Sequence, residues 1–400
     1  MTAAYELSRL GAFPLIMEKG DFLGGHAIQF ACKAGEKCQK CSACLVEERL
    51  KEVSENPDIA ILLKSELKDL VGENGKFKAG IKRYPTVIDP QKCNDCGICV
   101  EQCPVANKGA IKMAYSIHNH PRYAIDKTCC LHFTKEKACT ICQDACPNEA
   151  INLDRRSETI EERFGAIIVS TGFTPYNPRN KLQFGYGLHK NVVTALELEH
   201  ILRREGRVVR PSDGKEPKKV AFIQCVGSRE LKRPFCSRVC CSYALRLAEA
   251  IRWRQPNVRV TMFYIDIQTF GKDFLKSYEK WHTDVRLIRM IPGDIYQIEG
   301  DRLCISFMDS QTHHVLDEEF DMAILSIGIM PAMDNEALAE VLQIELDSNG
   351  FMATTDHLDN TKTSREGVYL AGTSQGPRDI ADAVAHAGRA AWEAAKYIGA

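Results

Sequence analysis

The sequence lacks several features that would assign it to other classes of protein. It has no basic excess, since 52 lysine and arginine residues oppose 53 aspartate and glutamate residues. That balance argues against a general binder of nucleic acid or anionic membranes. Its strongest apolar run, residues 323–329, is only strand-sized, and residues 1–20 lack the apolar centre of a secretory signal. We therefore expect a cytoplasmic chain without a transmembrane segment, whose 400 residues form two or three domains.

Cysteine is abundant, with 18 residues, and a disulfide framework does not explain it. Such frameworks belong to short secreted domains, whereas thiols in a reducing compartment stay free and often ligate metal when they cluster. Only Cys304 stands alone, and we expect it to be a buried strand residue. The other seventeen form four groups, which predict metal centres.

The strongest pattern lies in the middle two groups. The first is C-x2-C-x2-C-x3-C followed by Pro104, the run of bacterial ferredoxins, in which the fourth cysteine ligates the other cluster of a pair. The second repeats the ending C-x2-C-x3-C before Pro147, with Cys129 and Cys130 as candidates for its first ligand. Zinc, the alternative, prefers two separated pairs. The crossed arrangement predicts two [4Fe–4S] clusters, one at Cys93, Cys96, Cys99 and Cys146, the other at Cys103, Cys130, Cys139 and Cys142.

Two further groups are less specific. Four thiols within thirteen residues favour another [4Fe–4S] cluster, with zinc or free thiols as alternatives: Cys32, Cys38, Cys41 and Cys44. The last group contains an adjacent pair, which suits two irons of one cubane better than a single ion. Buried thiols in a strand and a helix are its alternative: Cys225, Cys236, Cys240 and Cys241.

Around these groups the sequence indicates a dinucleotide-binding scaffold. The acid Glu18 ends a short strand, and Gly24 and Gly25 follow it, as in the second half of a Rossmann unit, where the acid binds a ribose. The glycine-rich turn of such a unit would lie before residue 1, so the unit looks N-terminally truncated. A buried strand ends in Thr171-Gly172, and a later one leads to Gly372 and a helix rich in small residues. Flavin-dependent disulfide-reductase-like folds place such segments around FAD.

A second Rossmann start appears at residues 218–224. Where a nicotinamide-binding domain carries a glycine fingerprint, this one has Cys225. Binding of NAD(P)H there is therefore disfavoured, and an NAD(P)H-dependent disulfide reductase is a weaker interpretation.

The chain resembles the A subunit of heterodisulfide reductase over essentially its whole length. The resemblance is most specific at residues 210–215, 220–229 (VAFIQCVGSR), 236–241 (CSRVCC) and 375–380 (QGPRDI). It implies a thioredoxin-reductase-like α/β FAD/NAD(P)-binding scaffold with an inserted α+β two-cluster ferredoxin domain. It also implies a cluster at the group containing Cys225, favours Cys130 over Cys129 as a ligand, and adds Asp379 to the FAD site.

The resemblance also implies a domain order. The FAD-binding domain would occupy residues 1–84, 156–215 (including a connector) and 333–400. The ferredoxin-like insert would occupy residues 85–155, and the second Rossmann-like domain residues 216–332.

The function implied is that of an iron–sulfur flavoprotein subunit of an anaerobic oxidoreductase complex. Electrons would pass between FAD and the [4Fe–4S] clusters, and flavin-based electron bifurcation is compatible with this subunit type. Its partners would be other subunits of a redox complex and ferredoxin, hydrogenase-type or heterodisulfide-reductase-type electron partners, with no nucleic acid. The alternative is a non-catalytic electron wire that carries clusters but no flavin.

Overall fold

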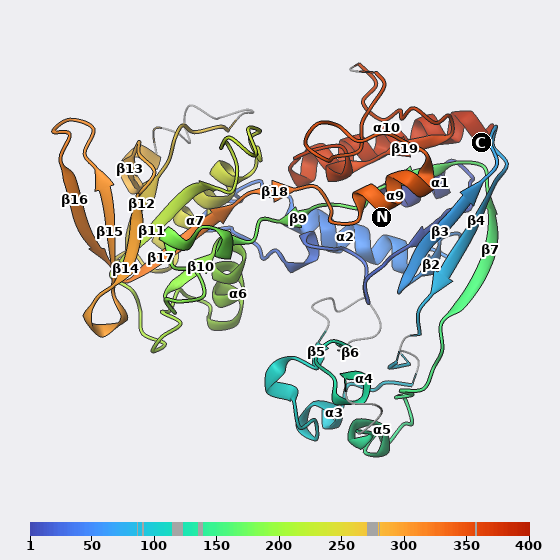
Figure 1. Ribbon diagram of the computed structural model, residues 1–400, viewed down its shortest axis with the longest axis horizontal. Coiled ribbons are helices and arrows are strands. Elements are labelled where there is room, and N and C mark those ends of the chain that lie inside the picture. Colours follow the sequence, from blue (N-terminus) through green and yellow to red (C-terminus); the bar gives the residue numbers. More distant parts are fainter. Residues whose placement is uncertain are drawn as a thin grey trace.

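The computed structural model describes residues 1–85, 87–89, 92–113, 123–134, 139–269, 279, 281–356 and 358–400. The chain forms two lobes joined by extended segments, and a small third unit hangs below one lobe (Figure 1). No helix among the described residues is both long and apolar enough to cross a bilayer.

The first lobe contains both ends of the chain. Two short pairs of parallel strands form its centre. Strand β1 pairs with β2, and β8 pairs with β19. A three-stranded antiparallel sheet in the order β3-β4-β7 packs beside them. The strands are β1 (Leu15–Met17), β2 (Ala60–Leu62), β3 (Ser65–Val71), β4 (Phe77–Arg83), β7 (Glu158–Phe164), β8 (Ile167–Val169) and β19 (Val368–Leu370). The helices are α1 (Thr2–Arg9), η1 (Ala27–Gln29), α2 (Ala43–Ser54), α9 (Asn335–Leu342), η6 (Gly372–Ser374) and α10 (Ile380–Ile398).

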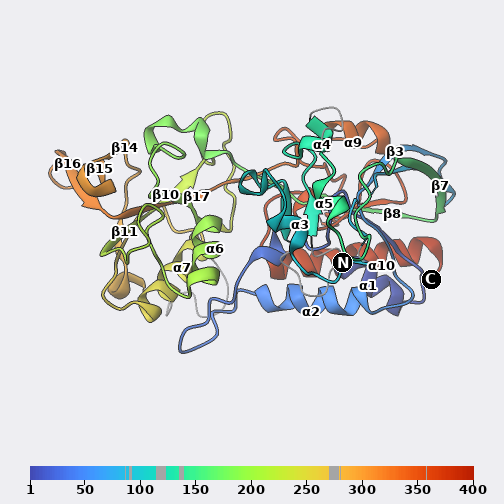
Figure 2. The same ribbon diagram turned by 90° about the horizontal axis from the view of Figure 1, so that it is seen from below.

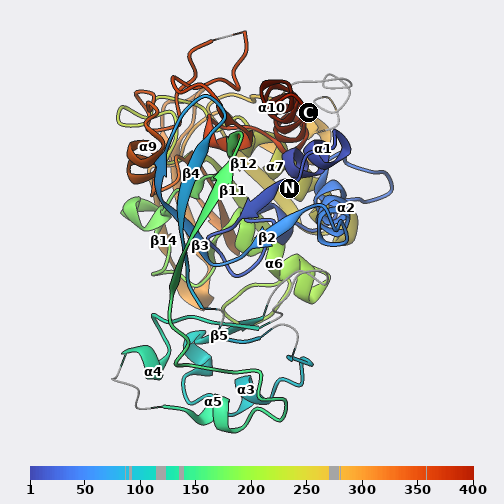
Figure 3. The same ribbon diagram turned by 90° about the vertical axis from the view of Figure 1, so that its right-hand side faces the viewer.

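The small third unit is an excursion between two neighbouring strands. Strands β4 and β7 pair along their whole length, with Arg83 opposite Glu158, so the chain leaves and re-enters the sheet at one point (Figure 3). A bridge between Ile88 and Ile151 closes its neck. Its elements are α3 (Ile98–Glu101), η2 (Ala106–Lys108), β5 (Ile111–Met113), β6 (Tyr123–Ile125), α4 (Leu131–Thr134) and α5 (Ile141–Asp144).

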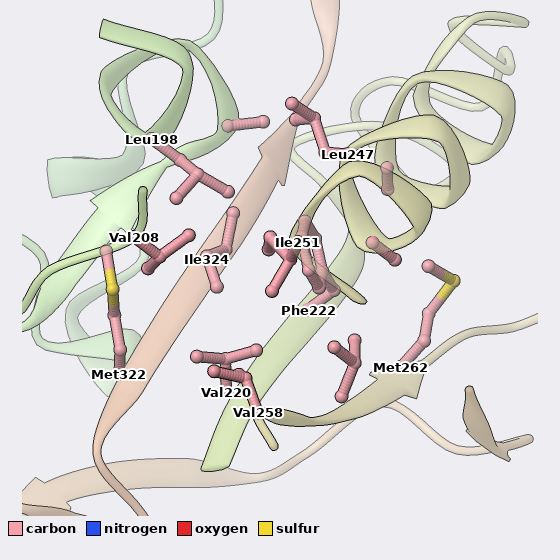
Figure 4. Close-up of a cluster of buried hydrophobic side chains, with 14 of the residues drawn as sticks. Leu198, Val208, Val220, Phe222, Leu247, Ile251, Val258, Met262, Met322 and Ile324 are labelled. Carbon is pink, nitrogen blue, oxygen red and sulfur yellow. The ribbon is translucent and has the colours of Figure 1, made fainter. Parts of the chain in front are cut away.

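The second lobe is built on a five-stranded parallel sheet in the order β10-β17-β11-β12-β13. Helices cover one face, and Phe222 and Ile324 of the central strands pack there against Leu198 and Leu247 (Figure 4). A three-stranded antiparallel sheet covers the other face. The elements are β10 (Val192–Thr194), α6 (Ala195–Glu205), β11 (Lys219–Val226), α7 (Cys240–Arg254), β12 (Arg259–Phe263), β13 (Arg286–Ile288), β14 (Asp294–Gln297), η5 (Glu299–Asp301), β15 (Leu303–Met308), β16 (Val315–Phe320) and β17 (Met322–Ile327).

The two lobes are joined by two antiparallel segments, β9 (Thr174–Pro175) and β18 (Ile329–Met330) (Figures 1 and 2). After β9 the chain makes two short 3-10 turns, η3 (Pro178–Asn180) and η4 (Leu182–Phe184), and then enters the second lobe. The fold differs here from the predicted domain division. Residues 192–205 fall in the stretch 156–215 that was assigned to the FAD-binding domain and its connector, but they form β10 and α6, and β10 pairs with β17 in the parallel sheet of the second lobe.

Candidate functional site

The third unit brings one predicted set of four thiols around a single small cavity. Cys93, Cys96 and Cys99 come from the loop before α3 and from the helix itself, and Cys146 follows α5. All four line the cavity, together with Gly97 and Tyr123. Burial and then the charges of the neighbouring Cys93, Cys96 and Cys146 together raise the pKa of the Cys99 thiol to about 11. Thiols held this closely resist ionising together unless a cation compensates their charge.

The second predicted set gathers around Cys142 in α5. Burial and then the charges of neighbouring thiols together raise the pKa of this thiol to about 12. The neighbours are Cys130, Cys103, Cys139 and Cys99. Cys103, which comes from the first sequence run, therefore lies with the thiols of the second, as the crossed arrangement requires.

A repeated turn positions the first cysteine of each set. The backbone N–H of Asp89 bonds to Ala150 and that of Asp126 to Ala110, which ties both turns to the opposite half of the unit. The carbonyl of Asp89 then accepts the N–H of Cys93 at 3.0 Å, and that of Asp126 accepts the N–H of Cys130 at 3.0 Å. The Asp-x3-Cys spacing of this turn is visible in the sequence, but its meaning becomes clear only from these hydrogen bonds. The carbonyl of Asp126 also accepts the N–H of Cys129 at 3.2 Å, just as that of Asp89 accepts the N–H of Lys92 at 3.2 Å, so Cys130 is the residue whose place in the turn matches that of Cys93.

The last group of cysteines gathers at the C-terminal ends of the parallel strands in the second lobe. The register of β11 shifts between Ile223 and Val226, and Cys225 in this bulge has a φ of +59°. Left-handed backbone is strained for a side chain with Cβ and occurs where a residue must be re-aimed. The bulge thus accounts for the orientation of the first thiol.

The other thiols of this group come from α7 and the loop before it. Cys240 and Cys241 form its first turn, where the helix dipole favours negative charge. Burial raises the pKa of Cys240, and the charges of Cys241, Cys225 and Cys236 raise it further. The four predicted residues therefore lie together.

The Cys32–Cys44 loop is arranged differently. Cys32, Cys38 and Cys44 are exposed and Cys41 is half-buried. The loop is fixed by its other residues, because the buried Lys33 forms an ion pair with Glu199 of α6, and Arg246 of α7 donates to the carbonyl of Gln39 at 3.1 Å. The structure thus places the loop against α6 and α7 and leaves most of its thiols at the surface.

No three His, Cys, Asp or Glu side chains among the described residues converge closely enough to bind one metal ion. Thiolates around a cubane stand farther apart than the ligands of a single ion, because they bind different irons. Each of the sets in the third unit and at Cys225 offers the four thiols that a [4Fe–4S] cluster needs, one for each iron. For the Cys32–Cys44 loop the structure favours neither a cluster nor zinc.

The predicted flavin residues lie in the first lobe around the ends of its parallel strands. Glu18 follows β1, and burial raises the pKa of its carboxyl group. Thr171 and Gly172 follow β8, while Gly372 follows β19, and these two strands are parallel neighbours. The C-terminal ends of β8 and β19 therefore lie side by side and form one edge of the first lobe.

The glycines at this edge suit the close approach of a ligand. Gly172 has a φ of +75°, and a Cβ on it would meet no atom within 4 Å, so its turn faces open space. Gly24 has a φ of +101°, and a Cβ there would lie 2.8 Å from that of Ile28. His26, next to Gly25, stacks on Phe173 and bonds to its carbonyl at 3.2 Å, which joins the two glycine turns. These features fit a flavin site.

Two further residues hold the last turn of this edge. Asp379 caps α10 by accepting the N–H of Asp382 at 2.8 Å, so its role in the fold is structural. His386, absent from the sequence-based predictions, accepts the N–H of Gly372 at 3.0 Å through Nδ1. Its other ring nitrogen bonds to the carbonyl of Asn360 at 3.0 Å.

Comparison with known proteins defines the class first. Residues 86–106 match the model of the 4Fe-4S binding domain. The fold is that of thioredoxin reductases: the enzyme of T. acidophilum aligns with a TM-score of 0.51 and 14% identity, covering 99% of this chain and 93% of that one. The enzyme of Lactococcus lactis aligns with a TM-score of 0.52 and 13% identity, covering 100% and 95%. The chain is thus a thioredoxin-reductase-like protein with a ferredoxin-type insert.

Sequence similarity then gives the relatives of the chain. The chain is 35% identical over 412 residues to the A subunit of the H(2):CoB-CoM heterodisulfide,ferredoxin reductase of Methanothermobacter marburgensis, covering 98% of this chain and 61% of the relative. It is 34% identical over 412 residues to the iron-sulfur A 2 subunit of the CoB--CoM heterodisulfide reductase of Methanopyrus kandleri, covering 100% and 62%. The chain spans about three fifths of the length of these relatives, and over that part it is similar to heterodisulfide reductase A subunits.

Proposed function

We propose that this chain is an iron–sulfur flavoprotein subunit of an oxidoreductase complex. The observation that carries the proposal is the crossed gathering of thiols in the third unit, where Cys103 and Cys146 each lie with the cysteines of the other run. Similarity to heterodisulfide reductase A subunits supports it. When bound, [4Fe–4S] clusters supply one-electron steps and FAD can exchange electrons in pairs.

The chain's own contribution is to hold and insulate these groups. Three cluster sites are proposed, and in each the cysteines would bind as thiolates whose charge the iron compensates. The ligands would be Cys93, Cys96, Cys99 and Cys146; Cys103, Cys130, Cys139 and Cys142; and Cys225, Cys236, Cys240 and Cys241. A fourth cluster at Cys32, Cys38, Cys41 and Cys44 remains part of the proposal on the basis of spacing alone.

The proposed FAD site is the edge formed by the strand ends of the first lobe. Glu18 would bind a hydroxyl of the ribose, and the glycine turns would let the backbone approach the pyrophosphate. The turn residues are Gly24, Gly25, Thr171, Gly172 and Gly372, while Asp379 would act through the first turn of α10.

The setting of this chemistry is also a proposal. The names of the relatives refer to heterodisulfide and ferredoxin, so electron partners of these kinds, held by further subunits of a complex, are proposed here. Electron bifurcation at the flavin and a cytoplasmic location, suited to reduced thiols, belong to the same proposal.

Adjacent cysteines provide a matched test of the cluster sites. The chain would be purified without oxygen, and its iron, acid-labile sulfide and flavin would be measured. Cys130→Ser should lose about four iron atoms per chain, because it removes a ligand of a [4Fe–4S] cluster, whereas Cys129→Ser should keep them. Equal iron in both variants, or zinc without sulfide in the unaltered chain, would overturn the proposal.

The second candidate function is an electron wire without flavin. The exposed Cys32–Cys44 loop favours this function, because a centre held there would be accessible at the surface. Flavin absorbance of the same preparation separates the two functions: iron with flavin supports the flavoprotein subunit, and iron without flavin supports the wire.

A further inference from the structure

Arg229 lies beside the cysteines of the second lobe and is not explained by ligand binding. It is four residues after Cys225, in left-handed backbone with a φ of +58°. Its N–H bonds to the carbonyl of Phe235 at 3.1 Å, which draws the residue before Cys236 toward the end of β11. The backbone at Arg229 thus closes the loop that joins two of the thiols.

The guanidinium group of Arg229 is held in place by an ion pair with Asp266, in the loop after β12. The carbonyl of this same aspartate accepts the thiol of Cys241 at 3.7 Å. The backbone N–H of Gln268 also points at this sulfur, at 3.4 Å. The cation is therefore anchored within the shell of groups that surrounds Cys241.

The field of this cation reaches two thiols from different elements. Burial raises the pKa of both Cys225 and Cys241; the charge of Arg229 lowers each pKa, and the charge of its partner Asp266 raises each. In the third unit the corresponding neighbour is an acid: the thiol of Cys93 lies 3.9 Å from Oδ1 of Asp95, whose charge raises the pKa of Cys93. An ion pair thus lies beside the cysteines of the second lobe, whereas an acid lies beside Cys93.

We propose that Arg229 is a positioning residue that raises the reduction potential of a [4Fe–4S] centre held by Cys225, Cys236, Cys240 and Cys241. The proposal rests on the function proposed above. Reduction adds one electron to the centre, and a fixed cation nearby stabilises the added negative charge. The centre in the second lobe therefore has a higher potential than the one beside Asp95, and electrons run downhill from the third unit to the second lobe.

The test is a redox titration of the anaerobic chain with dithionite, followed by electron paramagnetic resonance. The signal lost in Cys240→Ser identifies the centre in the second lobe, and the signal lost in Cys99→Ser identifies the one beside Asp95. In the unaltered chain the first should be reduced at the higher potential.

Arg229→Gln should lower the potential of the centre in the second lobe. We expect about a tenfold change in the ratio of oxidised to reduced centre at a fixed potential, which is ~59 mV for one electron. Arg229→Lys keeps the charge and should shift it less. Arg289→Gln is the matched control, because the exposed Arg289 also acts on Asp266 but bonds to the carbonyl of Ile265. It should shift the potential least.

An unchanged potential in Arg229→Gln, with full iron content, would overturn the proposal. So would equal shifts in Arg229→Gln and Arg289→Gln, since the effect would then be one of net charge. The absence of any signal that depends on Cys240 in the unaltered chain would instead refute the cluster site itself, which keeps the two failures distinct.

Discussion

The third unit gathers two sets of four thiols and the second lobe gathers one, and the two regions place these thiols differently relative to their hydrophobic cores. In the described part of the third unit, cysteines form much of the core, and Cys99, Cys130 and Cys142 are buried in it. In the second lobe the core is built from aliphatic and aromatic side chains such as Phe222 and Ile324. The cysteines of the second lobe lie at the C-terminal ends of the parallel strands.

This difference indicates two ways of coupling a metal centre to a fold. A unit whose core is made of thiols has little apolar surface to bury without the centre, so metal binding and folding become one process. A parallel sheet with helices on it is stable by burial of its own side chains, and a centre at its edge can be removed with little effect on the core.

Removal of iron should therefore produce the largest and most uneven effect. Cys142→Ser is expected to lose one cluster and to destabilise the third unit around it, because the centre replaces part of its core. Cys240→Ser is expected to lose a cluster while the second lobe stays folded. Hydrogen exchange read by mass spectrometry would show fast exchange of residues 92–113 in the first variant and retained protection of β11 and β17 in the second.

Cys304→Ser is the control, since this buried residue of β15 lies outside the four groups. It should keep the iron content and the exchange pattern. Equal protection of the third unit with and without iron would remove the distinction between the two sites.

The Cys32–Cys44 loop sharpens the comparison, because protein contacts hold it rather than a core. Lys33 is 4% exposed and Glu199 1% exposed, and the hydroxyl of Tyr243 also bonds to Glu199. Lys33→Met should destabilise the second lobe and its docked loop by about 3–5 kcal/mol, because it leaves a buried carboxylate without its partner. Denaturant unfolding followed by tryptophan fluorescence would measure this, since Trp253 packs on Gly35 of the loop.

The double variant Lys33→Met with Glu199→Leu tests the cause. It removes both charges from the buried site and should recover most of the lost stability. A double variant as unstable as the single one would show that the loop is held by contacts other than the ion pair.

The sequence predicted the parts of the structure that follow from local spacing. The two cysteine runs, their proline ends and the strand that leads to Cys225 are short-range patterns, so the fold class could be predicted, and the comparisons confirm it. The burial of Cys304 was also predicted correctly. The ligand assignments stay predictions.

What could not be predicted depends on contacts between distant residues. Arg229 stood inside a motif used for the resemblance, but its partner Asp266 is 37 residues away and follows a different strand. The ion pair of Lys33 joins residues 166 positions apart. The membership of β10 in the second sheet likewise depends on pairing with β17, which no local pattern reveals.

The smallest expected effect concerns the proposed FAD site of the first lobe. Hydrogen bonds hold this site, so its stability should depend on pH rather than on iron content. Burial, and then the charge of Arg378, lowers the pKa of His386 from its ordinary value of 6.5. The unfolded chain therefore takes up this proton first. The stability contributed by neutral His386 is fully present above about pH 6.5 and is lost as the pH falls toward the lowered folded-state value.

Protonation of His386 would also remove the acceptor for the N–H of Gly372, a loss of about 1 kcal/mol. Flavin retention and thermal stability of the first lobe should both decline as the pH falls below about 6.5, as absorbance after gel filtration and calorimetry would show. His386→Asn keeps an acceptor near the place of Nδ1 and should abolish the decline. If it declines as steeply as the unaltered chain, the proton acts elsewhere, and the contrast between a site held by hydrogen bonds and one held by iron fails at this edge.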